Sequence, residues 1–181
     1  MKRILLGLAF VLTSMTANAQ LIYGLGITGG GIIGTNTNSD AVAGNVGEFK
    51  TTTVAAGAAV AGAATTVSKN LTSVSLTAGD WLVSGTCNML GSTLVATVLS
   101  CGLGTTTDTQ ATQAGGSGIG TDPLSVVSFA SSTLPNSVRE VSVHPTRVSL
   151  SATTTIYMVV NNTFSSGSYT MYGTIKAWRV R

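Results

Sequence analysis

The end of the chain constrains the fold most, because two strand-like runs, 153–164 and 168–181, follow each other there across a short turn. Apolar side chains recur at every second position in both runs, which is the period of a β-strand. Pairing Phe164 with Tyr169 aligns apolar positions on one face: Val160 opposite Gly173, Met158 opposite Ile175, and Ile156 opposite Ala177. Because a slip of one residue would send these side chains to the other face, the pattern predicts a long hairpin in this register, with Asn162 as its polar exception.

Shorter strand-like runs recur between turn signals from Glu48 onward. The expected strands before the terminal hairpin are 49–54, 65–68, 71–76, 81–89, 92–100, 126–130, 138–143 and 146–150. The alanine-rich stretch 54–64 is compatible with a helix, but its two glycines and its position between strands favour a loop or edge strand equally. The sequence therefore predicts an all-β fold, an antiparallel β-sandwich of jelly-roll type.

The start of the chain has the three-part pattern of a secretory signal peptide. A basic start at Met1–Arg3 precedes an apolar run over 4–13 and an A-x-A signature at Ala17–Ala19. We expect residues 1–19 to be removed before Gln20. The apolar run is shorter than the roughly 20 residues that a transmembrane helix needs, so we expect an exported chain with no integral membrane segment.

A glycine-rich stretch separates this start from the strands. Residues 20–47 are expected to form an arm or linker, and residues 48–181 the β-sandwich domain. The sequence Gly24–Gly29 superficially matches a dinucleotide-binding fingerprint, but it lacks the strand–helix context that binding requires. No cofactor is therefore expected.

Few residues carry charge, 8% against about 25% in ordinary globular domains. Without Lys2 and Arg3, seven basic side chains face six acidic ones, so the mature chain is almost neutral. Its only local basic cluster is the tail, with Lys176, Arg179 and Arg181. Nucleic acid is therefore not an expected partner. A surface rich in serine, threonine, glycine and alanine is typical of extracellular fibres and capsid-like proteins.

The residues that usually perform catalysis are scarce. His144 is the single histidine, so no second imidazole is present to complete a metal site. A Ser-His-Asp triad is not expected either, because the sequence has no nucleophile-elbow pattern such as G-x-S-x-G. Asp80 and Asp122 lie in turn contexts, where carboxylates commonly accept hydrogen bonds from backbone amides. We expect no catalytic residues. A glycan depolymerase, the remote enzymatic alternative, would need two carboxylates across a groove.

Cys87 and Cys101 leave two possibilities open. In an exported protein they would favour a disulfide, which closes a loop of about 15 residues and stabilises by roughly 3 kcal/mol. If strands 81–89 and 92–100 form a hairpin that turns at Leu90–Gly91, however, the thiols face apart, and this register argues against the bond. A different turn register would reverse the answer.

The large aromatic residues and one long polar stretch indicate which parts of the chain are buried and which could make contacts. Trp81 opens a strand after a turn and is expected in the core. Tyr172 and Trp178 lie on the face opposite the predicted core, beside Lys176, either as lone surface aromatics or as contacts to a subunit or a glycan. The polar stretch 102–120 is expected to form a long loop.

Five ordered motifs resemble a β-domain that recurs in phage and prophage proteins described as tail-fibre or structural proteins. They are Gly47–Glu48, Leu76–Gly85, Gly118–Pro123, Pro145–Leu150 and Tyr172–Arg181, within a resemblance that covers about residues 45–181. The chain departs from that pattern at Trp178, where the family favours arginine. The resemblance implies a trimeric virion appendage component with a jelly-roll-like head and a role in attachment, and it carries over no catalytic residue.

Two non-enzymatic hypotheses follow. The first is a phage-type virion structural or attachment protein, whose partners would be other virion proteins or a host surface glycan and which would form a homotrimer. The alternative is an exported surface or periplasmic module of prophage origin that binds glycans or mediates adhesion. The first predicts protein in virions, and the second predicts protein in the periplasm or medium.

Overall fold

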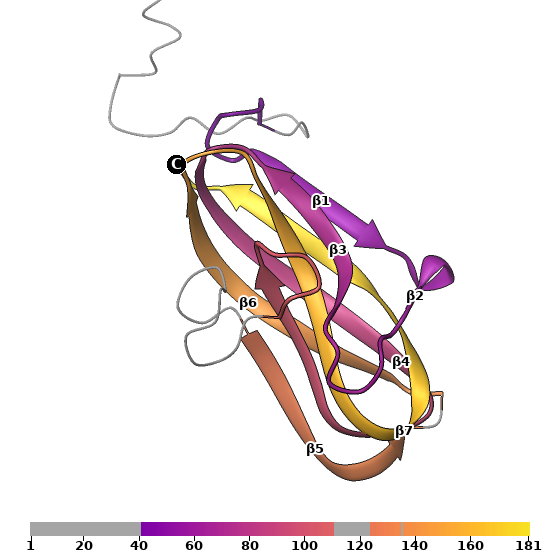
Figure 1. Cartoon of the computed structure of the whole chain (residues 1–181). Helices are drawn as coiled ribbons and strands as arrows, with labels where there is room; N and C mark the ends of the chain where they lie inside the picture. Colours follow the sequence, from indigo (N-terminus) through magenta and orange to yellow (C-terminus); the bar gives the residue numbers. More distant parts are fainter. Residues whose placement is uncertain (1–40, 111–123, 135) are drawn as a thin grey trace, which may run out of the picture. The chain divides into compact units, whose positions relative to one another are not determined.

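A computed structural model describes residues 41–110, 124–134 and 136–181, which belong to a compact unit spanning Asp40–Arg181. These residues form strands almost throughout (Figure 1). The elements are β1 (Phe49–Val54), a 3-10 turn η1 (Ala56–Ala58), β2 (Val60–Ala61), β3 (Lys69–Leu76), β4 (Gly79–Gly104), β5 (Leu124–Leu134), β6 (Val138–Leu150) and β7 (Thr154–Arg179). The predicted signal peptide and most of the predicted arm lie outside the described residues.

Two long strands organise the domain. β4 and β7 each contain 26 residues and pair antiparallel from Trp81↔Arg179 to Gly104↔Tyr157. The register shifts between Ser92 and Val98, and there both strands bend. Gly167 lies at this bend with a φ of +89°, and an added Cβ would be 2.6 Å from the Thr93 carbonyl oxygen. Each long strand is thereby divided into two halves (Figure 1).

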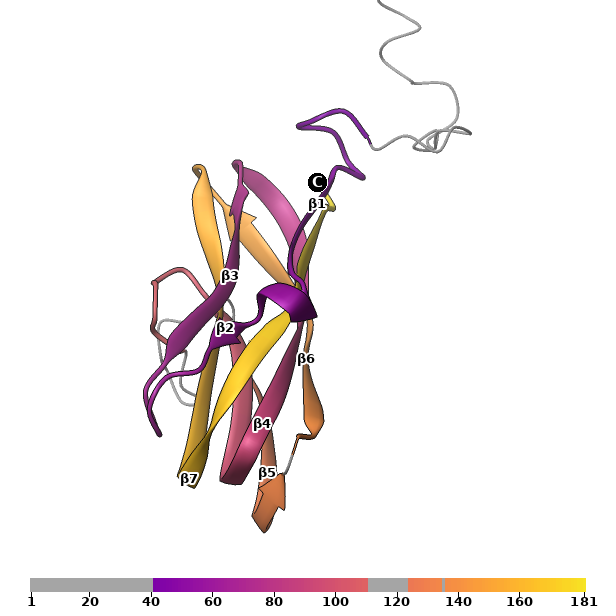
Figure 2. The same cartoon turned by 90° about the vertical axis from the view of Figure 1, so that its right-hand side faces the viewer.

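The two halves of each long strand belong to two facing layers (Figure 2). In layer 1, the first half of β4 lies between β6 and the second half of β7, whose other edge carries β1 and β2. In layer 2, the second half of β4 lies between β5 and the first half of β7, whose other edge carries β3. Apolar side chains from both layers fill the space between them.

The predicted terminal hairpin is wrong in its pairing and right in its buried face. Val160 pairs with Lys69 and Cys101, while Gly173 pairs with Val54 and Cys87, so both edges of each residue are occupied. The apolar side chains of the two halves, among them Met158 and Ile175, are fully buried and lie in opposite layers. Alternation identifies which face of a strand is buried. It does not specify whether two such strands pair side by side in one sheet or face each other across the core.

The two layers touch directly in the core. A Cβ added to Gly85 in layer 1 would lie 2.5 Å from the Met158 sulfur of layer 2. Trp81 has an exposed fraction of 0%, which confirms its prediction as a core residue. Gly85 is therefore a position where one layer makes room for a large side chain of the other.

A disulfide joins Cys87 to Cys101, with a Cα–Cα distance of 6.2 Å. The expectation that the thiols face apart is wrong, because β4 does not fold back as a hairpin at Leu90–Gly91. It continues into the second layer, and both cysteines turn into the core. The bond therefore connects layer 1 to layer 2.

The all-β antiparallel prediction is confirmed, whereas the jelly-roll connectivity stays a prediction. β1 has the predicted bounds. The alanine-rich stretch 54–64 begins at the last residue of β1 and otherwise contains η1 and β2. Residues 65–68 are not a strand. The predicted strand pairs 81–89 with 92–100 and 138–143 with 146–150 are continuous in β4 and β6. Of the predicted loop, 102–104 end β4, and 111–120 lie outside the described residues.

Candidate functional site

Segments far apart in the sequence meet at one end of layer 1, beside the C-terminus (Figure 1). The Gly47 amide donates to the Arg179 carbonyl oxygen at 2.9 Å, and the Arg179 amide donates to the Glu48 carbonyl oxygen at 2.9 Å. The Val180 amide donates to the Asp80 carbonyl oxygen at 2.9 Å. We call this group, with the side chains of Glu48, Asp80, Trp81, Arg147, Arg179 and Arg181, the terminal clamp.

The buried half of the clamp is built around Arg179. Its Nε lies 3.0 Å from Glu48 Oε2, and its Nη1 donates to the Ala78 carbonyl oxygen at 2.8 Å. The guanidinium also stacks over the Trp81 ring, 4.3 Å from the ring centroid. Both side chains of the ion pair are almost fully buried. A buried pair of this kind is tolerated because further hydrogen bonds satisfy the remaining donors.

The Glu48 carboxylate is held in its charged form. Burial raises its pKa, but the hydrogen bond from the Gly44 amide at 2.8 Å and the Arg179 guanidinium together outweigh burial. Lys50, 3.5 Å away, acts in the same direction. The net pKa of Glu48 therefore lies below its ordinary value. Glu48 connects the segment before β1 to the end of β7.

The outer half of the clamp is centred on Asp80, which sequence analysis assigns to a structural turn. Its Oδ2 lies 2.8 Å from an Arg147 nitrogen and 2.9 Å from Arg181 Nε. The hydrogen bond from Arg147, followed by one from Ser149, lowers the pKa of Asp80. The two arginine side chains remain 56% and 68% exposed. One carboxylate thus holds two accessible guanidinium groups.

Sequence analysis missed the roles of Glu48 and Arg179. A signal was present, because Arg179 continues the alternation of Met171, Ile175 and Ala177 on the core face. A charged residue at such a position requires a buried partner. Glu48, which directly precedes the neighbouring strand β1, is that partner.

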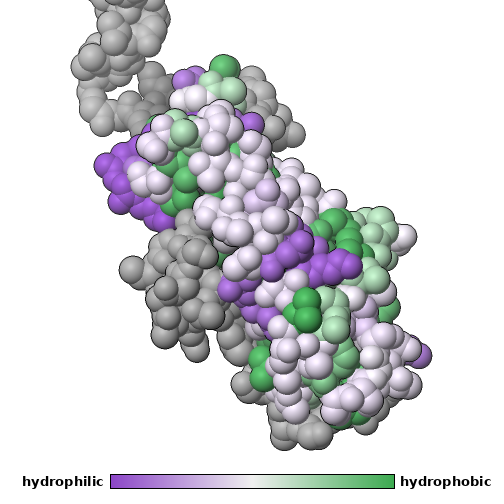
Figure 3. Space-filling model, in the orientation of Figure 1, coloured by the Kyte–Doolittle hydropathy of each residue, from purple (hydrophilic) through white to green (hydrophobic). Residues whose placement is uncertain are grey.

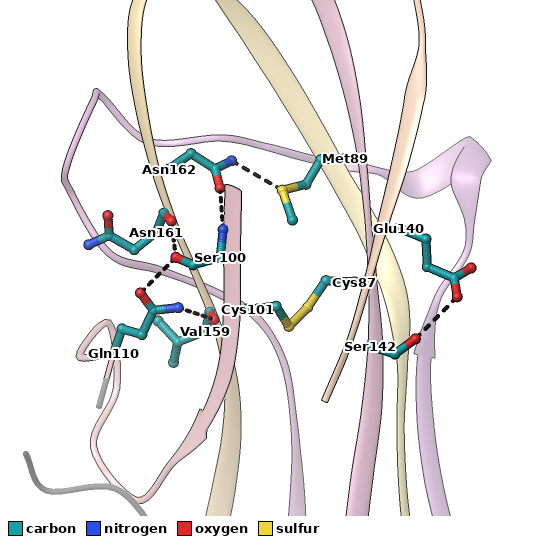
Figure 4. Close-up of a disulfide and its surroundings, with 10 residues drawn as sticks. All are labelled: Cys87, Met89, Ser100, Cys101, Gln110, Glu140, Ser142, Val159, Asn161 and Asn162. Carbon is teal, nitrogen blue, oxygen red and sulfur yellow. Dashed lines mark hydrogen bonds between the residues drawn. A yellow bond between two sulfur atoms is a disulfide. The ribbon is translucent and has the colours of Figure 1, made fainter. Parts of the chain in front are cut away.

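A second polar cluster surrounds the disulfide (Figure 4). Asn162 bridges the layers, because its Oδ1 accepts from the Ser100 amide at 3.1 Å and its Nδ2 lies 3.2 Å from the Met89 sulfur. Gln110 Nε2 donates to the Val159 carbonyl oxygen at 3.3 Å, and its Oε1 lies 3.0 Å from the Ser100 hydroxyl. Both polar side-chain atoms of Asn162, the polar exception in the predicted apolar face, therefore have a partner within the core.

The segment that follows β4 is attached to β3 by reciprocal bonds. The Asn70 amide nitrogen donates to Asp108 Oδ1 at 2.7 Å, and the Asp108 amide donates to Asn70 Oδ1 at 2.8 Å. The bonds between Asn70 and Asp108 hold the segment after β4 against β3. On the face of the molecule seen in Figure 3, a hydrophilic band crosses a surface of intermediate hydropathy that also carries hydrophobic patches.

The predicted contact residues Tyr172, Lys176 and Trp178 all lie on the outer face of layer 1. Trp178 is 37% exposed, and its ring centroid is 5.2 Å from that of Phe49 on β1. Lys176 is exposed and lies two positions away on the same face, about 7 Å along the strand. Tyr172 is about 20 Å from Trp178 along β7. The structure therefore brings Lys176 and Trp178 together and separates Tyr172 from them.

Among the described residues, the further features that could indicate a function are histidine, clusters of metal-ligating side chains and apolar helices. His144 is exposed. Within residues 41–110, 124–134 and 136–181, no three histidine, cysteine, aspartate or glutamate side chains gather to hold a metal ion. The same ranges contain no helix with the length and apolar character needed to cross a membrane. Asp122, the other aspartate assigned to a turn, lies outside the described residues.

No protein-family model and no curated protein matches the chain. Among solved structures, a chain in the structure of infectious bursal disease virus strain Gx superposes with a TM-score of 0.41 and 14% sequence identity. The match covers 83% of the present chain and 36% of the viral chain, so the present chain spans well under half of that chain's length. A superposition this loose carries no argument about function.

Proposed function

We propose that the chain is a non-enzymatic, phage-type virion structural or attachment protein that acts by contact. One observation carries the proposal. Four of the five motifs that resemble the phage β-domain contribute to the terminal clamp, through Glu48, Asp80, Arg147 and Arg179. What the chain shares with that family is therefore a set of residues that hold a domain end together, rather than a reactive group.

The carboxylates support a role without catalysis. Among the described residues, Glu48 and Asp80 are bound to arginines, Asp108 accepts from a backbone amide, and Glu140 accepts from the Ser142 hydroxyl. Each of the four therefore has a local partner, with Glu48 and Asp80 both in the terminal clamp and Asp108 and Glu140 elsewhere in the domain. A glycan depolymerase would instead need two carboxylates facing each other across a groove.

The clamp also bears on how the domain would be mounted. It ties the segment 41–48 to the last residues of β7, so the chain enters the domain at the end where it leaves. In a homotrimer, which the resemblance implies, three N-terminal arms would emerge from the same end.

A second candidate is an exported surface or periplasmic module, and the disulfide favours it. Disulfides persist in oxidising compartments, and the signal-like start of the sequence points to the same route. This candidate shares the contact role and differs in location.

Mass spectrometry on purified particles, and separately on periplasm and medium of the producing cell, distinguishes the two. The virion role predicts peptides in particles at a stoichiometry fixed relative to other virion proteins. A mature form that begins at Gln20 and occurs only outside particles would reject the virion role and leave the exported module. Non-reducing digestion of the same samples reports whether Cys87 and Cys101 are joined.

A further inference from the structure

We infer that the outer face of layer 1 at the clamp end binds an acidic glycan, with Trp178 as the stacking platform and Lys176, Arg147 and Arg181 as the cations that hold its carboxylates. This inference rests on the proposed contact function and names the ligand class and the surface. It is carried by the juxtaposition of an exposed indole with accessible cations.

Strand register places the platform. Phe49, Trp178 and Leu82 lie directly opposite one another on β1, β7 and β4, so their side chains form one row on the outer face. The Phe49 and Trp178 rings are inclined by 38° with centroids 5.2 Å apart. Phe49 therefore supports the indole from one side and leaves part of it open to solvent. The row is apolar but narrow, which suits the face of one sugar ring better than a protein surface.

Cations surround this row. Arg147 on β6 lies directly opposite Leu82 on β4. Lys176 lies two positions before Trp178 on β7 and therefore on the same face. The Arg181 side chain lies close to Arg147, because both form an ion pair with the Asp80 carboxylate. Counting side chains alone, the three cations Lys176, Arg147 and Arg181 and the one carboxylate of Asp80 give a net charge of +2. Both arginines keep donors for a ligand, because a guanidinium has five N–H groups and each contact to Asp80 engages one nitrogen.

The next rows supply hydroxyl groups. Thr51 and Ser84 flank Lys176 in register, followed by Thr53, Thr174 and Thr86. A saccharide presents hydroxyls to such side chains, C–H groups to an aromatic ring and, if it is acidic, carboxylates to cations. Charge complementarity thus favours an acidic glycan over a neutral one. It also disfavours a second copy of the same face, since two such faces would bring like charges together.

The other end of the same face provides an internal control. Tyr172 lies opposite Asn88, which in turn lies opposite Glu140 on β6. An aromatic side chain there has a carboxylate in its row instead of a cation. Tyr172 and Trp178 are therefore aromatics on one face with opposite electrostatic surroundings.

The test is a binding titration of the mature protein with oligogalacturonate as the acidic probe and dextran as the neutral one, followed by tryptophan fluorescence. Trp81 is fully buried, so a change in emission reports on Trp178. We expect the acidic probe alone to quench and shift the emission. Trp178→Ala and Lys176→Gln are expected to weaken binding, measured by calorimetry, at least about tenfold and roughly threefold, respectively. Tyr172→Ala is expected to bind as the wild type does.

Four results would overturn the inference: equal binding of dextran, equal binding of a single-stranded DNA oligomer, unchanged affinity in both the Trp178 and Lys176 variants, or a concentration-dependent dimer that Trp178→Ala abolishes. The Lys176 variant keeps the test decisive if Trp178→Ala fails to fold. Failure here is separable from failure of the proposed function. Protein found in particles without acidic-glycan binding rejects only this inference, and binding by a protein found only outside particles rejects only the virion role.

Discussion

The two tryptophans of this chain show how one residue type serves two purposes. Trp81 is fully buried, donates its indole N–H to the Thr77 carbonyl oxygen at 2.9 Å, and lies under the Arg179 guanidinium. Trp178, on the strand next to it, faces outward and keeps 37% of its surface exposed. Both have cationic neighbours. The difference in burial assigns the first to holding the domain end together and leaves the second available for contact.

Substituting each tryptophan by alanine should give the largest difference. Trp81→Ala removes a large buried side chain and the surface on which Arg179 stacks, and is expected to cost about 3–5 kcal/mol of unfolding free energy. Trp178→Ala loses mainly its contact with Phe49, and is expected to cost about 1 kcal/mol. Urea unfolding followed by circular dichroism measures both. Equal costs would mean that the outward tryptophan is as structural as the buried one.

The buried ion pair beside Trp81 can be broken from either side. Arg179→Met leaves the Glu48 carboxylate buried without its guanidinium, and is expected to cost about 3–5 kcal/mol. In Arg179→Met combined with Glu48→Gln, no buried charge lacks a partner, so part of that loss should be recovered. Arg147→Met serves as the matched control, since its ion pair with Asp80 is more exposed and should contribute about 1 kcal/mol or less. If the double variant were no more stable than Arg179→Met, unpaired charge would not explain the loss.

The disulfide allows a second comparison, between the two layers with and without a covalent bond joining them. Cys87 and Cys101 are 14 positions apart, and replacing both by serine is expected to cost roughly 3 kcal/mol. The unfolding midpoint of the wild type in dithiothreitol should approach that of the double variant in oxidising buffer. An unchanged midpoint in reductant would show that the layers are held by packing alone. This test also bears on location, because a domain that depends on the bond is suited to an oxidising compartment.

The sequence predicts burial in the two terminal runs better than it predicts strand pairing or the disulfide. Alternation in the terminal runs correctly predicts that Ile156, Met158, Ile175 and Ala177 are buried. It fails on their pairing, since strands side by side in one sheet and strands facing across a core produce the same pattern. The same ambiguity affects the cysteines. A strand that bends from one layer into the other brings Cys87 and Cys101 together, whereas a hairpin would keep them apart.

The candidate surface was predicted in part. Outward alternation places Lys176 and Trp178 on one face, and the structure agrees. The sequence could not show that Phe49 lies beside Trp178 or that Arg147 lies two strands away, because these neighbours come from β1 and β6, over 30 residues distant in the sequence. Long-range register, rather than local pattern, assembles both the clamp and the aromatic row.

The smallest expected effect is a dependence of stability on pH that distinguishes the clamp from the outer row. Glu48 has a lowered pKa in the folded state, whereas in the unfolded chain its carboxyl has an ordinary pKa near 4.5 and binds its proton more readily. Its stabilising contribution is therefore complete above that value and is lost as the pH falls through the folded pKa. Denaturant titrations from pH 7 down to about pH 3 should show a shallower acid loss in Glu48→Gln than in the wild type.

Asp80→Asn provides the comparison, because the pKa of Asp80 is also lowered, chiefly by Arg147, while its guanidinium partners are exposed to solvent. Salt screens exposed pairs more than buried ones. In about 0.5 M salt, the acid dependence that Asp80 contributes should therefore shrink, while that of Glu48 persists. Equal sensitivity of the two variants to salt would place Glu48 in contact with solvent and contradict the division of the clamp into a buried half and an outer half.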